Sequence, residues 1–108
     1  MELHESHKTK LVLNVRGAYI RRTDFSNTNL ADADLSHADA SGASFRNSNF
    51  KNARLIETIL RGSDLSGAKN LTIDQLSSAI IDDKTILPDY IDRSKLIDRT
   101  ARSHELLG

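Results

Sequence analysis

The sequence predicts an all-β solenoid, in which the chain winds into stacked four-sided coils. Three observations predict it. Large apolar residues recur every five positions, small residues stand two positions before them, and Asp or Asn often stands directly before them. The chain has 108 residues, which is enough for one small domain.

Each repeat is centred on one apolar residue, which we call the central position. Ten of the eleven central residues are large, the exception being Ala40: Val15, Ile20, Phe25, Leu30, Leu35, Ala40, Phe45, Phe50, Leu55, Leu60 and Leu65. Two residues earlier, at the small position, ten of eleven are Ala, Ser or Thr. One residue earlier, at the Asx position, seven of eleven are Asp or Asn. These coupled patterns predict one repeated structural unit.

A period of five fits neither common secondary structure. On an α-helix it turns the chain by roughly 140°, which scatters the large residues around the axis. On a straight strand it sends successive central residues to opposite faces. The pattern fits a chain that turns one corner per repeat, because the small and central residues then point to the same side. Four corners close a coil, and stacked coils pair their backbones about 4.8 Å apart.

Stacking every twenty residues predicts four faces. Face 1 carries Val15, Leu35 and Leu55; face 2 carries Ile20, Ala40 and Leu60; face 3 carries Phe25, Phe45 and Leu65; face 4 carries Leu30 and Phe50. The small column leaves room for four inward side chains, so the interior is expected to be full, without a substrate cavity. Ala40 should leave face 2 under-filled, so that either the coil pinches inward or Phe45 leans across.

The phrases TNLAD (28–32), ADLSH (33–37), ARLIE (53–57) and SDLSG (63–67) resemble the pentapeptide-repeat family, whose consensus is Ala, then Asp or Asn, then Leu, then two free positions. The resemblance covers residues 13–69. It implies a right-handed quadrilateral β-helix with four repeats per coil. This chain would make just under three coils.

The period divides the chain into a polar segment (1–10), the β-helix (11–69), a capping segment (70–88) and a C-terminal helix (89–108). Leu13, a large residue at a small position, is expected to seal the first coil. Thr72 and Gln75 have capping-box spacing and predict a short helix through about Ser78. Residues 79–88 are expected to be extended or turned. The last helix would pack on the coil end, pair with a second copy or project freely.

No motif in the sequence indicates catalysis or a cofactor. There is no cysteine, no glycine-rich phosphate loop and no metal-ligand spacing with enough ligands. His4 and His7 lack a third ligand, and His37 is expected to lie outside, against Glu57 one coil later. The aspartates at Asx positions are expected to bond to nearby backbone in turns.

The function expected from these residues is a non-catalytic interaction module with an unknown protein partner. Tyr19, Ile56 and Ile59 form a candidate interaction patch, unless the terminal helix covers it. The first alternative is an assembly subunit that forms a homo-oligomer through its coil ends or its C-terminal helix. The family resemblance adds a DNA-mimic role against type II topoisomerases. The chain has 15 acidic and 15 basic residues, so its formal net charge is zero. A neutral chain is a poor mimic of DNA, and for the same reason we expect no nucleic-acid or membrane partner. A cytoplasmic location is expected.

Overall fold

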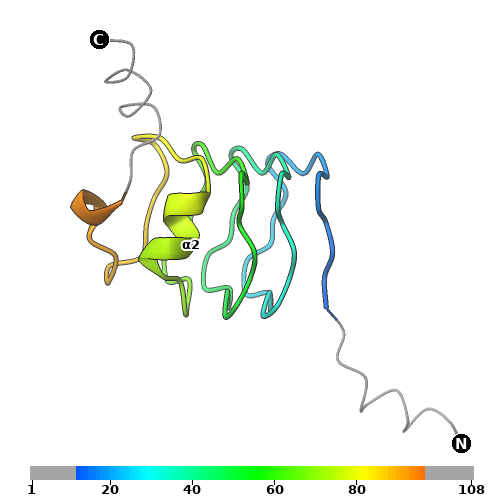
Figure 1. Ribbon diagram of the computed structural model, residues 1–108, viewed down its shortest axis with the longest axis horizontal. Coiled ribbons are helices and arrows are strands. Elements are labelled where there is room, and N and C mark those ends of the chain that lie inside the picture. The colour runs from blue at the N-terminus through cyan, green and yellow to red at the C-terminus, as the bar shows by residue number, and fades with distance from the viewer. Residues whose placement is uncertain (1–11, 97–108) are drawn as a thin grey trace, which may run out of the picture.

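The structure, a computed structural model, describes residues 12–96. Parallel backbone bridges join residues twenty apart, as between Asn14 and Asp34 and again between Asp34 and Arg54. The same spacing recurs on all four faces, so the chain forms stacked four-sided coils (Figure 1). Each face contributes a single bridge rather than a long strand, because a corner follows every fifth residue.

The corners explain the five-residue period. After each central residue come a first and a second turn position, and the next small residue closes the turn, as Ala18 N–H does by donating to Val15 O at 2.9 Å. The second turn position has a positive φ in all eleven repeats, as the third residue of a type II turn requires. Its occupants are Gly17, Arg22, Asn27, Asp32, His37, Gly42, Asn47, Asn52, Glu57, Gly62 and Gly67.

Two of these glycines make a matched test of the corner geometry. A Cβ at Gly62 would meet nothing within 4 Å, whereas one at Gly67 would overlap Asn47 Oδ1. We expect Gly62→Ala to cost about 1 kcal/mol, the strain of a left-handed backbone, and Gly67→Ala about 2 kcal/mol because Asn47 must also move. Urea denaturation measures both. Equal losses would mean that Asn47 yields without cost.

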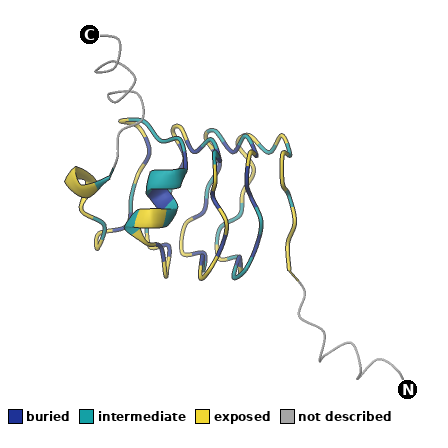
Figure 2. Cartoon of the chain, viewed as in Figure 1, coloured by how far each residue is buried: buried dark blue, intermediate teal, exposed yellow. Residues whose placement is uncertain are grey.

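The core is a column of central and small residues along the coil axis. Eight of the eleven central residues are buried: Leu30, Leu35, Ala40, Phe45, Phe50, Leu55, Leu60 and Leu65. Val15, Ile20 and Phe25 of the first coil are only half-buried, and Figure 2 shows the corresponding change from buried to exposed along the stack. The core is therefore sealed in its middle and less so at its N-terminal end.

Ala40 is fully buried on face 2. Its amide donates to Ile59 O at 2.8 Å, close to the 3.0 Å from Leu35 N to Arg54 O, so coil spacing is unchanged there. The same coil carries two phenylalanines. Phe45 stacks on Phe25 with ring centroids 5.3 Å apart, and it meets Phe50 at 5.4 Å. The smallest central residue of the chain thus shares its coil with two of the three phenylalanines.

The chain keeps building the coil beyond residue 69. Leu71, one residue later than the strict period, is buried where the next central residue belongs. Helix α2 (Ile73–Ser78) follows, and both hydrogen bonds of the expected capping box between Thr72 and Gln75 are present. Bridges from Ile59 to Ile80 and from Asp64 to Ile86 then continue faces 2 and 3.

The C-terminal helix expected over 89–108 is wrong in its described part. Residues 89–96 form a turn and the short 3-10 helix η1 (Arg93–Lys95), with Asp92 accepting from Ser94 N–H at its start. The Asp92 side chain accepts from Ser94 N–H and so favours a turn over a continuous helix here. Ile91 and Leu96 nevertheless pack against the core. Residues 97–108 lie outside the described residues, as do His4, His7 and residues 1–11 generally.

The small-position carbonyls of the last coil have donors on all four faces. In inner coils, the carbonyl at each small position accepts from the next coil, as Ala33 O accepts from Arg54 N–H at 2.8 Å. On faces 2 and 3 of the last coil, the amides of Ile80 and Ile86 supply this bond, at 2.8 and 2.9 Å. Residues 71–96, which we call the C-terminal cap, thus act there as a further coil.

On faces 1 and 4, two side chains replace the missing backbone donors. Gln75 Nε2 donates to Ala53 O at 3.0 Å and to Phe50 O at 2.9 Å. The hydroxyl of Tyr90 donates to Ala68 O at 2.6 Å and accepts from Leu71 N–H at 3.1 Å. The C-terminal end therefore leaves none of the four small-position carbonyls of this coil without a donor.

Candidate functional site

The outer faces of the coils carry the side chains that do not enter the core, and the Asx positions on these faces have a structural role. Asp39 Oδ1 accepts from Ser41 N–H at 3.1 Å, and Asn49 Oδ1 accepts from Lys51 N–H at 3.1 Å. The same bond is made by every Asp and Asn at an Asx position: Asn14, Asp24, Asn29, Asp34, Asp39, Asn49 and Asp64. The expected turn role of these residues is confirmed.

Three of these aspartates also pair with arginines, at a spacing that the five-residue frame did not predict. Arg21 contacts Asp39 at 2.8 Å, Arg46 contacts Asp64 at 3.1 Å, and Arg16 lies 3.8 Å from Asp34. Each pair is 18 residues apart, because the first turn position of one coil lies beside the Asx position of the next. Stacking by twenty residues predicts only the neighbour Arg54, which lies 3.9 Å from Asp34.

These contacts hold the aspartates in their charged form. Hydrogen bonds from Ser41 and Arg21 lower the pKa of Asp39, those from Ser36 lower the pKa of Asp34, and those from Ser26 lower the pKa of Asp24. A carboxyl whose pKa is lower in the folded chain stabilises the fold above its unfolded pKa, near 4. That contribution is lost as the pH falls through the lower, folded pKa.

We therefore expect the melting temperature to fall as the pH drops from 6 to 3. The double variant Asp24→Asn/Asp39→Asn should show a smaller fall, because asparagine keeps the turn bond, as Asn29 and Asn49 do, and does not titrate there. The control is Asp83→Asn/Asp89→Asn, at two exposed positions outside the repeats. Scanning calorimetry at both pH values measures the difference. Identical slopes for the two double variants would contradict this account.

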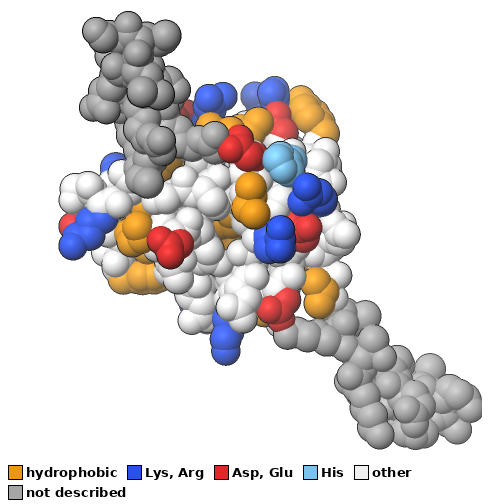
Figure 3. Space-filling model, viewed as in Figure 1, with side chains coloured by type: hydrophobic (Ala, Val, Ile, Leu, Met, Phe, Trp, Pro, Cys, Tyr) orange, Lys and Arg blue, Asp and Glu red, His pale blue; other side chains and the backbone are white. Residues whose placement is uncertain are grey.

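The structure spreads the candidate patch over separate places. Tyr19 is 73% exposed, and the Arg21 guanidinium lies over its ring, 5.0 Å from the centroid. Asp39 bridges to both Tyr19 and Ile59 and so separates them, while Ile59 is bridged on its other side by Ile80. Ile56 is 42% exposed. Figure 3 likewise shows hydrophobic side chains scattered among charged ones on the visible face.

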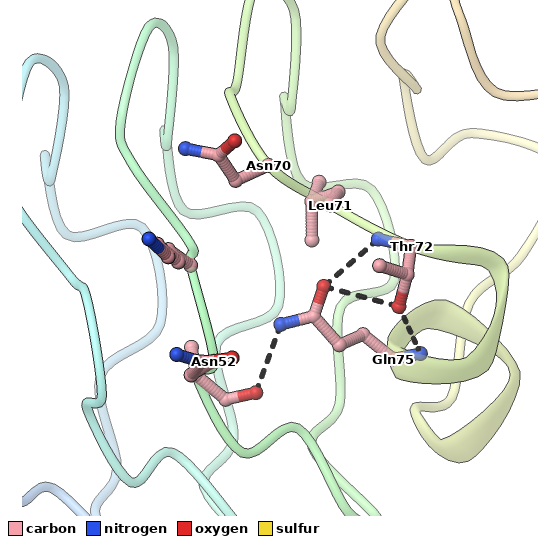
Figure 4. A pocket seen from close by; sticks show the side chains of 7 residues that line it. Asn52, Asn70, Leu71, Thr72 and Gln75 are labelled. Atoms are coloured by element: carbon pink, nitrogen blue, oxygen red, sulfur yellow. Dashed lines mark hydrogen bonds between the residues drawn. The ribbon is translucent and has the colours of Figure 1, made fainter.

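One surface hollow lies beside α2 and has a volume of about 450 Å³ (Figure 4). Its lining consists of Lys51, Asn52, Ala53, Asn70, Leu71, Thr72 and Gln75. The amide of Gln75, which lines this hollow, is already bonded to the coil and to Thr72.

Among residues 12–96, no group of three or more His, Cys, Asp or Glu side chains is placed to hold a metal ion. His37 and Glu57 lie one coil apart at second turn positions. Both have the positive φ of the corner, so their positions follow from the repeat. None of the helices in this described range is long and apolar enough to cross a membrane. The outward Asx and turn positions of the coils, which we call the outer ladders, are the candidate site.

A repeated four-sided β-coil with small, Asx and apolar columns defines a class of repeat protein. The family described as pentapeptide repeats matches residues 14–47 and 28–67, in eight copies. The chain belongs to the pentapeptide-repeat family. This membership supports its classification as a non-catalytic repeat protein.

Among solved structures, this chain is similar to a pentapeptide repeat protein, Rfr23, from the cyanobacterium Cyanothece 51142, with 27% identity and a TM-score of 0.62. The match covers 71% of this chain and 52% of that protein, so this chain spans about half its length. A match to alr5209, a pentapeptide repeat protein from Nostoc Pcc 7120, has 22% identity and a TM-score of 0.31, and covers 87% and 86% of the two chains. No curated protein matches this chain.

Proposed function

We propose that this chain is a rigid protein-protein interaction module whose outer ladders bind another protein. One observation carries the proposal: the interior is filled by the chain's own central side chains. Because the interior is filled, a partner would be contacted by the side chains at the outer positions. Those positions are fixed in space by the coil-to-coil hydrogen bonds, so binding would require little ordering of the surface.

The DNA-mimic role is the weaker candidate. A mimic of duplex DNA would need a dense acidic surface, whereas acidic and basic residues are equal in number here. Three of the outward aspartates, Asp34, Asp39 and Asp64, also lie against arginines, which offsets their charge.

The part of the surface best suited to a protein partner lies around Ile56 and Ile59. Ile56 is 42% exposed at a first turn position, and Ile59, three residues later, forms a half-buried bridged pair with Ile80 on face 2. An apolar side chain held on a rigid face, with charged residues around it, is the usual composition of an interface centre and its rim.

The test compares two substitutions at equivalent exposed positions. Ile56→Gln removes the apolar contact, and Lys51→Gln is the control, because Lys51 is also at a first turn position and exposed. A partner captured by the wild-type chain and then purified should bind Lys51→Gln with unchanged affinity and Ile56→Gln at least about tenfold more weakly in calorimetry. Equal affinities for all three chains would overturn the choice of this surface.

A further inference from the structure

The N-terminal end of the coil stack differs from the closed C-terminal end. Val12 and Leu13 are 47% and 36% exposed, and the central residues Val15, Ile20 and Phe25 are only half-buried. Within the described residues, no element covers them from the N-terminal side (Figure 1). Apolar side chains here therefore form one exposed end of an otherwise sealed core.

Backbone groups at this end are also without partners among residues 12–96. In the second coil, Asp39 N–H donates to Ala18 O and Asp39 O accepts from Ile20 N–H, both at 2.9 Å. The equivalent N–H and C=O groups of Tyr19, Asp24 and Asn29 in the first coil have no such bonds within this range. The end thus combines an apolar centre with the unpaired edge of a sheet, a template for pairing with another chain.

The five-residue pattern does not continue upstream of the first coil. Extended backwards, the five-residue frame places Lys10 and Glu5 at central positions, where a buried charge is strongly unfavourable. Residues 1–10 contain only Met1 and Leu3 as large apolar residues. A second copy of the chain, in contrast, brings an apolar end of the same size and an edge with the same donors and acceptors.

We propose that the first coils of two copies pack head to head about a two-fold axis perpendicular to the coil axis. Such an axis makes the facing strands antiparallel, and hydrogen-bonded residue pairs of antiparallel strands exchange N–H and C=O bonds. The edge is self-complementary in this sense, because each Asx position presents one donor and one acceptor. This inference involves a different surface from the proposed function and does not rest on it.

Of the two axes that pass through opposite faces, charge excludes one. An axis through faces 1 and 3 would set Asp24 against its own copy, and like charges directly opposite each other are destabilising. An axis through faces 2 and 4 sets Tyr19 against Tyr19 and Asn29 against Asn29, and it sets Asp24 against the uncharged Asn14. The exposed Tyr19 ring would then gain an aromatic partner.

The chain contains no cysteine, so a single introduced cysteine can pair only with its counterpart in another copy. Facing residues of antiparallel strands have Cα atoms about 4.5–5.5 Å apart, within the range of a disulfide. Under mild oxidation, Tyr19→Cys and Asn29→Cys should each become mainly a reducible dimer. Asp24→Cys alone should stay monomeric on a non-reducing gel, but a mixture with Asn14→Cys should give the mixed dimer.

Sedimentation of the wild-type chain provides the second measurement, and its mass should double as the concentration rises. The proposal is overturned if the wild-type chain remains a monomer at all concentrations. It is also overturned if Asp24→Cys self-links in place of Tyr19→Cys, or if the wild-type chain dimerises while neither Tyr19→Cys nor Asn29→Cys links.

Discussion

Gln75→Glu is expected to destabilise the chain by about 2–4 kcal/mol at neutral pH. The amide nitrogen of Gln75 donates to Ala53 O and Phe50 O, and a carboxylate at that place can donate to neither. Phe50 O still accepts from Ala53 N–H, so Ala53 O loses its donor and both carbonyls face a negative charge. Denaturant titration at pH 7 measures the loss.

The substitution separates two functions of one side chain. A glutamate still accepts from Thr72 N–H, so the capping box of α2 survives while the closure of face 1 is lost. Asp74→Asn, on the exposed surface of the same helix, is the control. Below about pH 4 the introduced carboxyl is protonated and regains one donor, so the difference from wild type should shrink there. A loss under about 0.5 kcal/mol at pH 7 would show that α2 does not close the coil.

Ala40→Leu is expected to destabilise the chain by up to about 3 kcal/mol through overpacking. The second coil already holds two phenylalanines at its central positions, whereas the third coil, centred on Leu55, Leu60, Leu65 and Leu71, holds none. Face 2 lies opposite face 4 in a four-sided coil. A leucine at position 40 would therefore meet the side of the coil that Phe50 already fills.

The double variant Ala40→Leu/Phe50→Leu should recover most of that loss. It gives the second coil a size pattern close to that of the first, where Ile20, Phe25 and Leu30 occupy faces 2, 3 and 4. The two substitutions should thus be non-additive by more than about 1 kcal/mol in a double-mutant cycle. If Ala40 sat beside a void, the single variant would instead be neutral or stabilising, and the cycle would show no coupling.

The repeated part of the fold could be predicted because each of its three columns reports a separate physical requirement. The central residues fill the coil, the small residues leave space beside them, and the Asx side chains bond to the backbone at each corner. The left-handed corner itself was harder to recognise, because glycine occupies only some of the second turn positions. Arg22 and Glu57, for example, adopt positive φ without any residue type that would signal it.

The C-terminal cap was harder to predict because its spacing changes. Ile80 lies 21 residues after its partner Ile59, and Ile86 lies 22 after Asp64, so a strict period of five stops at residue 69. Two faces are closed by side-chain groups, Gln75 Nε2 and the Tyr90 hydroxyl, which have no counterpart in the repeat. The sequence pattern predicts a helix that includes Tyr90, whereas Tyr90 lies in a turn.

The closed C-terminal end limits how copies of this chain can assemble. If both ends of a β-coil carried unpaired backbone, each copy could add to the next in the same direction, and such head-to-tail growth produces a filament. Here the small-position carbonyls at the C-terminal end already have donors, so that end offers a neighbouring strand fewer free acceptors than it would without the cap. By supplying donors to Ala53 O and Ala68 O, Gln75 and Tyr90 therefore oppose head-to-tail growth and favour a closed pair of N-terminal ends.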